Sequence, residues 1–333
     1  MRRRASVSLA LLAATVGTVL TGTATLRAQR PAYPAPNAAT DTLETLPVQG
    51  RVSMIGGAGG NIVVQVGDDG VVLVDAGLEP FAGKVLAEVR RLSPKPIRMI
   101  VSTTTDGDHL GGNDAVSKAG EPLYRAQNSG AVTIPGAMLV GHERAALALS
   151  RVEGPAALPQ KLWPFDTFFG PLKKVFANGE PVEIHHLPAS HTDGDVLVFF
   201  RGSDVIAAGD AYDTTGYPRV DPAAGGSLSG IIDALNRIIT IAVPSFNQIG
   251  GTRIVPGHGR ISNQSDVVEY RDMATIVRDR IRLLVKQGRS LEQVRAAGVT
   301  KDYDGIYGAS AGPWTTAQFI EAIYREETRA ARR

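Results

Sequence analysis

Histidine and aspartate residues recur just past apolar, strand-like runs of the sequence, and their side chains are ones that can hold a metal ion. Four such positions occur, most of them with glycine neighbours: Asp108-His109, His191, Asp210 and His258. A single histidine usually has a structural or surface role, but loops that follow several strands present their side chains at one rim of a sheet. We therefore expect these residues to meet and to bind a divalent ion, either zinc or a harder ion such as manganese or iron.

The absence of cysteine narrows the chemistry further. None of the 333 residues is cysteine, which excludes disulfides, thiolate metal sites and a cysteine nucleophile. No Ser-His-Asp arrangement competes with the metal interpretation. Tyr212 and Tyr217 closely follow Asp210, and they could either line a substrate pocket or pack within their own loop.

The periodicity of apolar residues predicts the elements that must position these side chains. The runs 52–55, 61–66 and 71–75 are short, rich in β-branched residues and separated by glycine-containing turns, which predicts a meander of strands. A helical stripe over 79–92 and a strand over 97–101 come next. The order recurs later in the chain, with strands at 182–184, 196–200 and 205–208, a helix at 228–239 and a strand at 253–255.

Two copies of this pattern predict an α/β (α+β) fold in which two sheets pack face to face with helices outside, a four-layer αββα sandwich. No linker divides the copies, so we expect one domain over residues 46–275. The chain then turns helical, with a helix opened by the capping box Ser290-Leu291-Glu292-Gln293. We expect residues 276–333 to form a helical extension packed on the domain.

The first residues of the chain are typical of a secretory signal. Arg2-Arg3-Arg4 precedes a short apolar run and then small residues up to Ala28. We expect residues 1–28 to be a cleaved signal peptide, residues 29–45 to be a flexible linker containing prolines, and the protein to be periplasmic or secreted. An uncleaved N-terminal anchor is the alternative; after cleavage, no stable membrane span is expected.

The net charge of the chain without its first 28 residues gives no indication of a nucleic-acid partner. Residues 1–28 contain four of the 35 basic residues and none of the 33 acidic ones, which leaves the rest of the chain with a net charge near −2. Such a chain lacks the excess of basic residues with which nucleic-acid-binding proteins contact phosphates. A hydrophobic content of 43% and a charged content of 20% are ordinary for a globular protein. We expect a small-molecule substrate, and the oligomeric state stays unknown.

These motifs, in this order, resemble those of the metallo-β-lactamase fold superfamily. That family's first motif reads His-x-His-x-Asp-His, and its last two residues match Asp108-His109. The family's downstream histidine matches His191, its bridging aspartate matches Asp210 and its final histidine matches His258. Asp75 looks like the family's early buried aspartate, which supports the motif loop and is not a ligand. The resemblance covers roughly residues 46–275 and implies the αββα fold.

The first motif departs from the family pattern at both of its leading histidines. Thr104 stands at the first of these positions and Asp106 at the second. The resemblance implies that the second metal position keeps its ligands, whereas the first keeps only His191, a shared Asp210 and a possible oxygen ligand in Asp106. The implied metal set is therefore Asp106, Asp108, His109, His191, Asp210 and His258. One ion or two, with Zn²⁺ the first expectation, would satisfy this pattern.

The resemblance implies a metal-dependent hydrolase, which the expected signal peptide would export. Water activated by the metal would attack the substrate, and Asp108 would hold this water and act as general base. Members of the superfamily cleave esters, thioesters, lactones, lactams, phosphoesters and sulfate esters, and nothing in the sequence selects among these bonds. The alternative is a non-catalytic periplasmic binding or sensor protein on the same fold, in which Thr104 marks a degenerate first site.

Overall fold

The computed structural model describes residues 36–124 and 136–332, and the expected signal peptide and the first part of the expected linker lie outside them. The described residues form a seven-stranded sheet and a five-stranded sheet. The first sheet contains, in spatial order, β1 (Glu44–Gln49), β2 (Val52–Gly56), β3 (Ile62–Val66), β4 (Val71–Val74), β5 (Ile97–Val101), β6 (Met138–His142) and β7 (Asp166–Phe168). The second contains β12 (Arg253–His258), β11 (Val205–Asp213), β10 (Val196–Phe200), β9 (Glu180–His186) and β8 (Leu172–Ala177).

Each sheet combines antiparallel hairpins with parallel strands beyond a crossover. Strands β1 to β4 pair antiparallel through tight turns, whereas β4, β5, β6 and β7 pair parallel. In the second sheet β8 to β11 are antiparallel and β12 joins β11 in parallel. Parallel neighbours place their carboxyl ends at the same edge of a sheet. The loops after β4 and β5 therefore leave the same edge of the first sheet, and the loops after β11 and β12 leave the same edge of the second.

Helices and 3₁₀ turns complete the described chain. The α-helices are α1 (Ala82–Leu92), α2 (Gly107–Leu110), α3 (Asn113–Lys118), α4 (Glu143–Ser150), α5 (Leu228–Ile241), α6 (Gln264–Lys286), α7 (Leu291–Ala296), α8 (Asp304–Tyr307) and α9 (Thr316–Ala330). The 3₁₀ turns are η1 (Glu79–Phe81), η2 (Gly154–Ala156), η3 (Gln160–Leu162) and η4 (Pro222–Ala224). No helix of the described residues is long and apolar enough to cross a bilayer.

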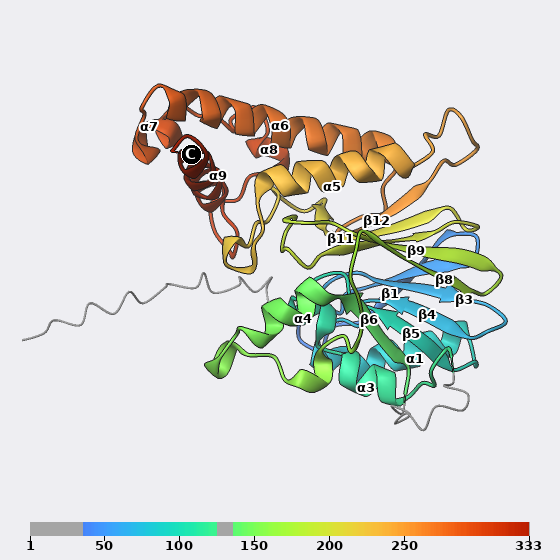
Figure 1. The fold of residues 1–333 in the computed structure, drawn as a ribbon. Helices are drawn as coiled ribbons and strands as arrows, with labels where there is room; N and C mark the ends of the chain where they lie inside the picture. The colour runs from blue at the N-terminus through green and yellow to red at the C-terminus, as the bar shows by residue number, and fades with distance from the viewer. Residues whose placement is uncertain (1–35, 125–135, 333) are drawn as a thin grey trace, which may run out of the picture. The chain divides into compact units, whose positions relative to one another are not determined.

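Three apolar clusters hold the layers together and confirm the expected αββα sandwich. The middle cluster lies between the sheets, with Val63, Met99 and Val140 facing Ile184 and Val198. The second packs the first sheet against α1 and α3, and the third packs the second sheet against α5, α6, α7 and α9. Figure 1 shows α1 and α3 outside one sheet and α5 with α6 outside the other.

The C-terminal helices share the third cluster with the second sheet. The ring of Phe319 on α9 is fully buried and stacks on Tyr217, with 4.5 Å between ring centroids. Arg282 on α6 pairs with Glu327 on α9 at 2.8 Å. The boundary expected after residue 275 lies inside α6, which runs unbroken from Gln264 to Lys286. The extension therefore packs on the sandwich as part of a common core.

We predict that Phe319→Ala lowers the free energy of unfolding by about 3–5 kcal/mol, because it leaves a cavity in this shared core. Urea denaturation followed by circular dichroism measures the change. Phe246→Ala is the matched control: Phe246 is 84% exposed, so its loss should change stability by no more than about 0.5 kcal/mol. Equal effects of the two substitutions would show that α9 does not belong to the core.

Candidate metal centre

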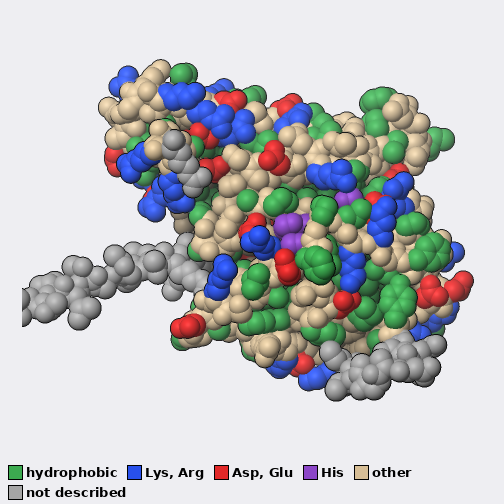
Figure 2. Space-filling model, viewed as in Figure 1, with side chains coloured by type: hydrophobic (Ala, Val, Ile, Leu, Met, Phe, Trp, Pro, Cys, Tyr) green, Lys and Arg blue, Asp and Glu red, His purple; other side chains and the backbone are tan. Residues whose placement is uncertain are grey.

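The six residues expected to hold a metal come together at the strand ends. Their ligand atoms form two sets, each with all atoms within 4.8 Å of one another. We call the first set, Asp108, His109 and His258, the Asp108 group. We call the second set, Asp106, His191 and Asp210, the Asp106 group. Figure 2 shows histidine side chains reaching the surface near the middle of one face, among hydrophobic, acidic and basic groups.

The carboxylate of Asp210 lies between the two groups. Its Oδ1 is 3.2 Å from Nε2 of His109 and 3.5 Å from Nε2 of His258, while its Oδ2 is 3.8 Å from Nε2 of His191. Asp210 lies within β11, whose register with β12 shifts on both sides of Gly209. Asp210 therefore faces histidines of both groups.

His109 is oriented by a buried aspartate at the end of β4. Nδ1 of His109 donates a hydrogen bond to Oδ2 of Asp75 at 2.7 Å, and Asp75 also accepts from the backbone nitrogen and hydroxyl of Thr103. Because Nδ1 carries the proton, Nε2 is left to face Asp210 and the centre of the site. Asp75 itself has a left-handed backbone, with φ of 65°.

The other two histidines are also fixed through their backbone surroundings. Nδ1 of His191 donates to the carbonyl of Arg219 at 3.1 Å, which turns Nε2 toward Asp106 and Asp210. Asn61, in the turn between β2 and β3, donates to the carbonyl groups of Pro256 and Gly259 on either side of His258. The first sheet thereby holds the ligand loop of the second.

Close packing explains two of the glycines that border these ligands. A Cβ atom at Gly257 would lie 2.3 Å from Oδ1 of Asp210, and one at Gly60 would lie 2.5 Å from Cε1 of His109. The backbone nitrogen of Gly60 also donates to the carbonyl of Asp108 at 3.1 Å. The glycine-rich turn between β2 and β3 is thus a wall of the site, where a larger side chain would displace a ligand.

The electrostatics of the cluster are dominated by opposite charges in a buried space. Although burial acts to lower it, the charges of Asp210 and Asp75 raise the pKa of His109 well above its usual value. Burial likewise opposes the shift at His191, but Asp106 and Asp210 raise the pKa of His191 to about 10. Despite burial, the charges of His109 and Arg219 hold the pKa of Asp210 well below its usual range. The buried carboxylates of the site are therefore stabilised by the positively charged groups around them.

The donor set fits a divalent ion. Nε2 of His109, Nε2 of His191 and both side-chain oxygens of Asp210 are buried and make no hydrogen bond of good geometry within the described chain. Buried polar atoms without such bonds are rare and need an explanation. Imidazole nitrogens and carboxylate oxygens that converge in this way are the ligands of zinc and similar ions. Asp108, 22% exposed, opens the cluster to solvent.

Arg219 is a member of the site that the sequence did not reveal. Its Nη2 is 3.4 Å from Oδ2 of Asp106 and 3.6 Å from Oδ2 of Asp210. These carboxylates raise the pKa of the Arg219 guanidinium further, even though burial acts to lower it. Thr104 belongs to neither ligand group, and its buried hydroxyl has no hydrogen-bond partner among the described residues. Arg219 lies in the irregular segment after β11, and no sequence pattern there identifies an arginine as part of a site.

Of the two roles considered for Tyr212 and Tyr217, a pocket wall or packing, the structure shows packing. Each is 2% exposed and belongs to the third apolar cluster. The hydroxyl of Tyr212 donates to Ser262, and that of Tyr217 donates to the carbonyl of Thr300. The physical reason is that β11 continues through Tyr212 to Asp213, and the C-terminal helices then cover Tyr217. Both residues contribute to packing.

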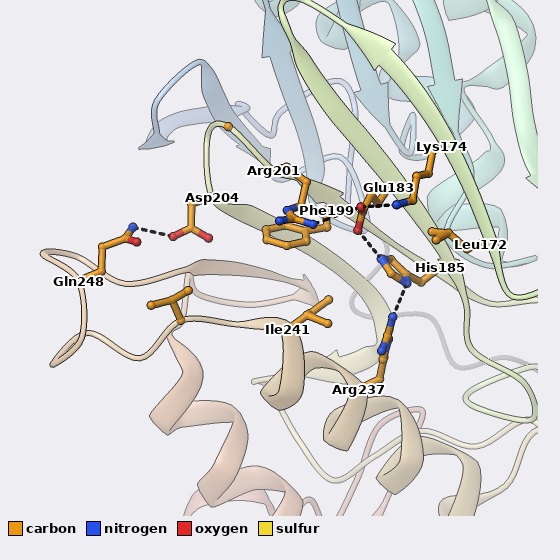
Figure 3. Close-up of a pocket in the computed structure, with 12 residues that line it drawn as sticks. Leu172, Lys174, Glu183, His185, Phe199, Arg201, Asp204, Arg237, Ile241 and Gln248 are labelled. Carbon is orange, nitrogen blue, oxygen red and sulfur yellow. Dashed lines mark hydrogen bonds and ion pairs between the residues drawn. The ribbon is translucent and has the colours of Figure 1, made fainter.

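A separate hollow of about 580 Å³ lies between the second sheet and the end of α5 (Figure 3). It contains none of the six candidate ligands. Glu183 in this hollow contacts Lys174, Arg201 and His185, and Arg237 bonds the other nitrogen of His185. The groups able to hold a metal ion lie instead at the strand ends, where the six candidate ligands meet.

Comparisons with known proteins agree with this architecture. Residues 55–259 match the family model described as the metallo-beta-lactamase superfamily, a span that includes all six candidate ligands. No curated protein matches the chain. The inverting sec-alkylsulfatase Pisa1 from Pseudomonas sp. has a TM-score of 0.62 and 16% identity, covering 85% of this chain and 50% of the sulfatase, so this chain spans half the length of that enzyme.

A shorter protein with a similar fold covers less of this chain. The metallo-beta-lactamase from Pontibacter korlensis has a TM-score of 0.51 and 19% identity, covering 70% of this chain and 99% of its own. At these identities the likeness shows a shared fold.

We predict that Asp75→Asn lowers the affinity for the metal by about 10–100-fold, because the amide cannot accept the proton-bearing Nδ1 of His109 as a carboxylate does. Titration of the metal-free protein with zinc in the presence of a chromogenic chelator measures this affinity. Asp204→Asn is the matched control, since Asp204 also has a left-handed backbone and bonds only residues away from the ligands. Unchanged affinity in Asp75→Asn would show that His109 does not need this partner.

Proposed function

Because the chain belongs to the metallo-beta-lactamase superfamily, we propose that it is a metal-dependent hydrolase whose ion is held by Asp108, His109, Asp210 and His258. The observation that carries the proposal is the convergence on the carboxylate of Asp210 of the buried Nε2 atoms of His109 and His191, which make no hydrogen bonds of good geometry. Zinc is the first candidate, and manganese or iron would suit the same two imidazoles and two carboxylates.

The bound ion would supply a water of lowered pKa and would polarise the bond under attack. Asp108 is the general base in this proposal, since it is the most exposed of the six ligand residues and lies 3.3 Å from His258 at the mouth of the site. Although burial acts to raise it, the hydrogen bond from His258 and the charge of His109 hold the pKa of Asp108 below its usual value. Asp108 is thus ionised and able to accept a proton.

The other residues of the chain keep this arrangement rigid. Asp75 fixes the ring of His109, the carbonyl of Arg219 fixes His191, and Asn61 holds the loop of His258. Such partners preorganise reacting groups and so reduce the cost of reaching the transition state. The substrate bonds that fit the proposal are those of esters, thioesters, lactones, lactams and phosphoesters.

Export is a further part of the proposal. The basic start, short apolar run and small residues before Ala28 support a cleaved signal and a periplasmic or secreted enzyme. We predict that the protein recovered from the periplasm or medium of a producing bacterium begins at Gln29, as intact-mass spectrometry would measure. An intact mass that retains residues 1–28 would show that they are an uncleaved anchor instead.

We predict that removing the metal with a chelator abolishes hydrolysis and that zinc, manganese or iron restores it. The measurement is a rate assay over a chromogenic ester, thioester, lactone, β-lactam and phosphoester. His258→Ala should remove both metal and activity, while Asp108→Asn should lower kcat by about 10²–10⁴-fold, the usual contribution of a general base.

The control for His258→Ala is His185→Ala, which removes a histidine from the hollow beneath α5 and should leave the rate unchanged. Full activity of His258→Ala would contradict the proposed site, and loss of activity in His185→Ala would move it to that hollow. Metal binding without hydrolysis of any of these substrates would favour a non-catalytic binding protein.

A further inference from the structure

The guanidinium of Arg219 places a permanent positive charge within the Asp106 group. Nη2 lies 3.4 Å from Asp106 and 3.6 Å from Asp210, and the arginine side chain is only 11% exposed. A guanidinium stays protonated in proteins and has no lone pair to offer a metal. An ion held by the Asp106 group would therefore face a fixed cation that uses the same carboxylate oxygens.

The two oxygens of Asp210 divide between the two groups. Its Oδ2 faces Arg219, whereas its Oδ1 faces Nε2 of His109 and Nε2 of His258. Arg219 thus pairs with Oδ2 of Asp210, and Oδ1 stays available to an ion held by the Asp108 group. Repulsion between an ion and Arg219 is also weaker there, since Arg219 forms its ion pairs with the carboxylates of the Asp106 group, Asp106 and Asp210.

We infer that Arg219 takes the place of a first metal ion, so that the chain binds a single ion at Asp108, His109, Asp210 and His258. This inference rests on the proposed function, because it assumes that the cluster binds metal. The inference also explains the aspartate at position 106. The Asp106 carboxylate forms an ion pair with the Arg219 guanidinium, which a histidine at position 106 could not form.

The charge of such a site favours an uncharged substrate. One divalent ion and Arg219 together carry three positive charges, which are outnumbered by the carboxylates of Asp106, Asp108, Asp210 and the Asp75 that faces His109. A centre with two ions and without Arg219 would carry one more positive charge, which would favour sulfate or phosphate groups. The site with one ion and Arg219 has no positive excess, so we infer that esters, thioesters, lactones or lactams are preferred over phosphoesters and sulfate esters.

The test is the number of metal ions per chain in the full protein, measured by elemental analysis after equilibration with zinc and removal of free ion. The wild type should hold one ion. Arg219→Ala should take up a second, because Asp106, His191 and Asp210 lose their cation, and Asp106→Ala added to Arg219→Ala should return the content to one. Arg282→Ala is the matched control, since it breaks the ion pair with Glu327 outside the site.

Two ions in the wild type, or one ion in a folded Arg219→Ala protein, would overturn the inference. Two ions together with hydrolysis would leave the proposed function standing, whereas no ion in any variant would overturn both. The ratio of kcat/KM for 4-nitrophenyl acetate to kcat/KM for 4-nitrophenyl phosphate or sulfate should fall by about tenfold from the wild type to a two-ion Arg219→Ala protein, because the added ion makes the site more positive. An unchanged ratio in the two-ion variant would overturn the charge argument.

Discussion

The carboxylate of Asp210 is the group on which the rest of the site depends. It is almost fully buried between three imidazoles and a guanidinium, and a buried carboxylate is stable only when cations or hydrogen bonds replace its lost hydration. Its neighbours come from separate segments of the chain, so the loops must be held together for the charge to be balanced. The metal centre can therefore assemble only when the strand ends fold together.

Contacts between the two sheets of the sandwich hold the strand ends together. Asp75 at the end of β4 fixes His109, and Asn61 from the first sheet holds the loop of His258 from the second. Glycines let the chains approach: Gly257 passes beside Asp210 where no Cβ atom would fit. These contacts place the ligands on a rigid frame, with Asp108 as the ligand residue most open to solvent.

Much of this arrangement could be predicted from sequence because it depends on local pattern. Short β-branched runs and amphipathic helices predicted the four layers, and ligand residues after successive strands predicted their common rim. The pairing of β11 was less accessible: the apolar run suggested a strand that ends near Ala208, but the strand continues to Asp213 and buries Tyr212. Tyr217 bonds Thr300, far along the chain, a tertiary contact that no periodicity encodes.

Arg219 was missed for the same reason, since a single arginine in an irregular segment has no pattern. Its importance follows only from its place beside Asp106 and Asp210, where it supplies the charge that the altered first motif leaves wanting. Thr104 and Asp106 therefore need not mark a decayed site. In this account they belong to a rebuilt one, in which a tethered cation replaces an exchangeable ion.

The most direct measurement is anomalous diffraction at the zinc edge from crystals of the zinc-loaded protein. The account predicts one strong peak within bonding distance of Asp108, His109, Asp210 and His258, with the guanidinium of Arg219 beside Asp106. A peak between Asp106 and His191, or no peak near Asp210, would contradict it.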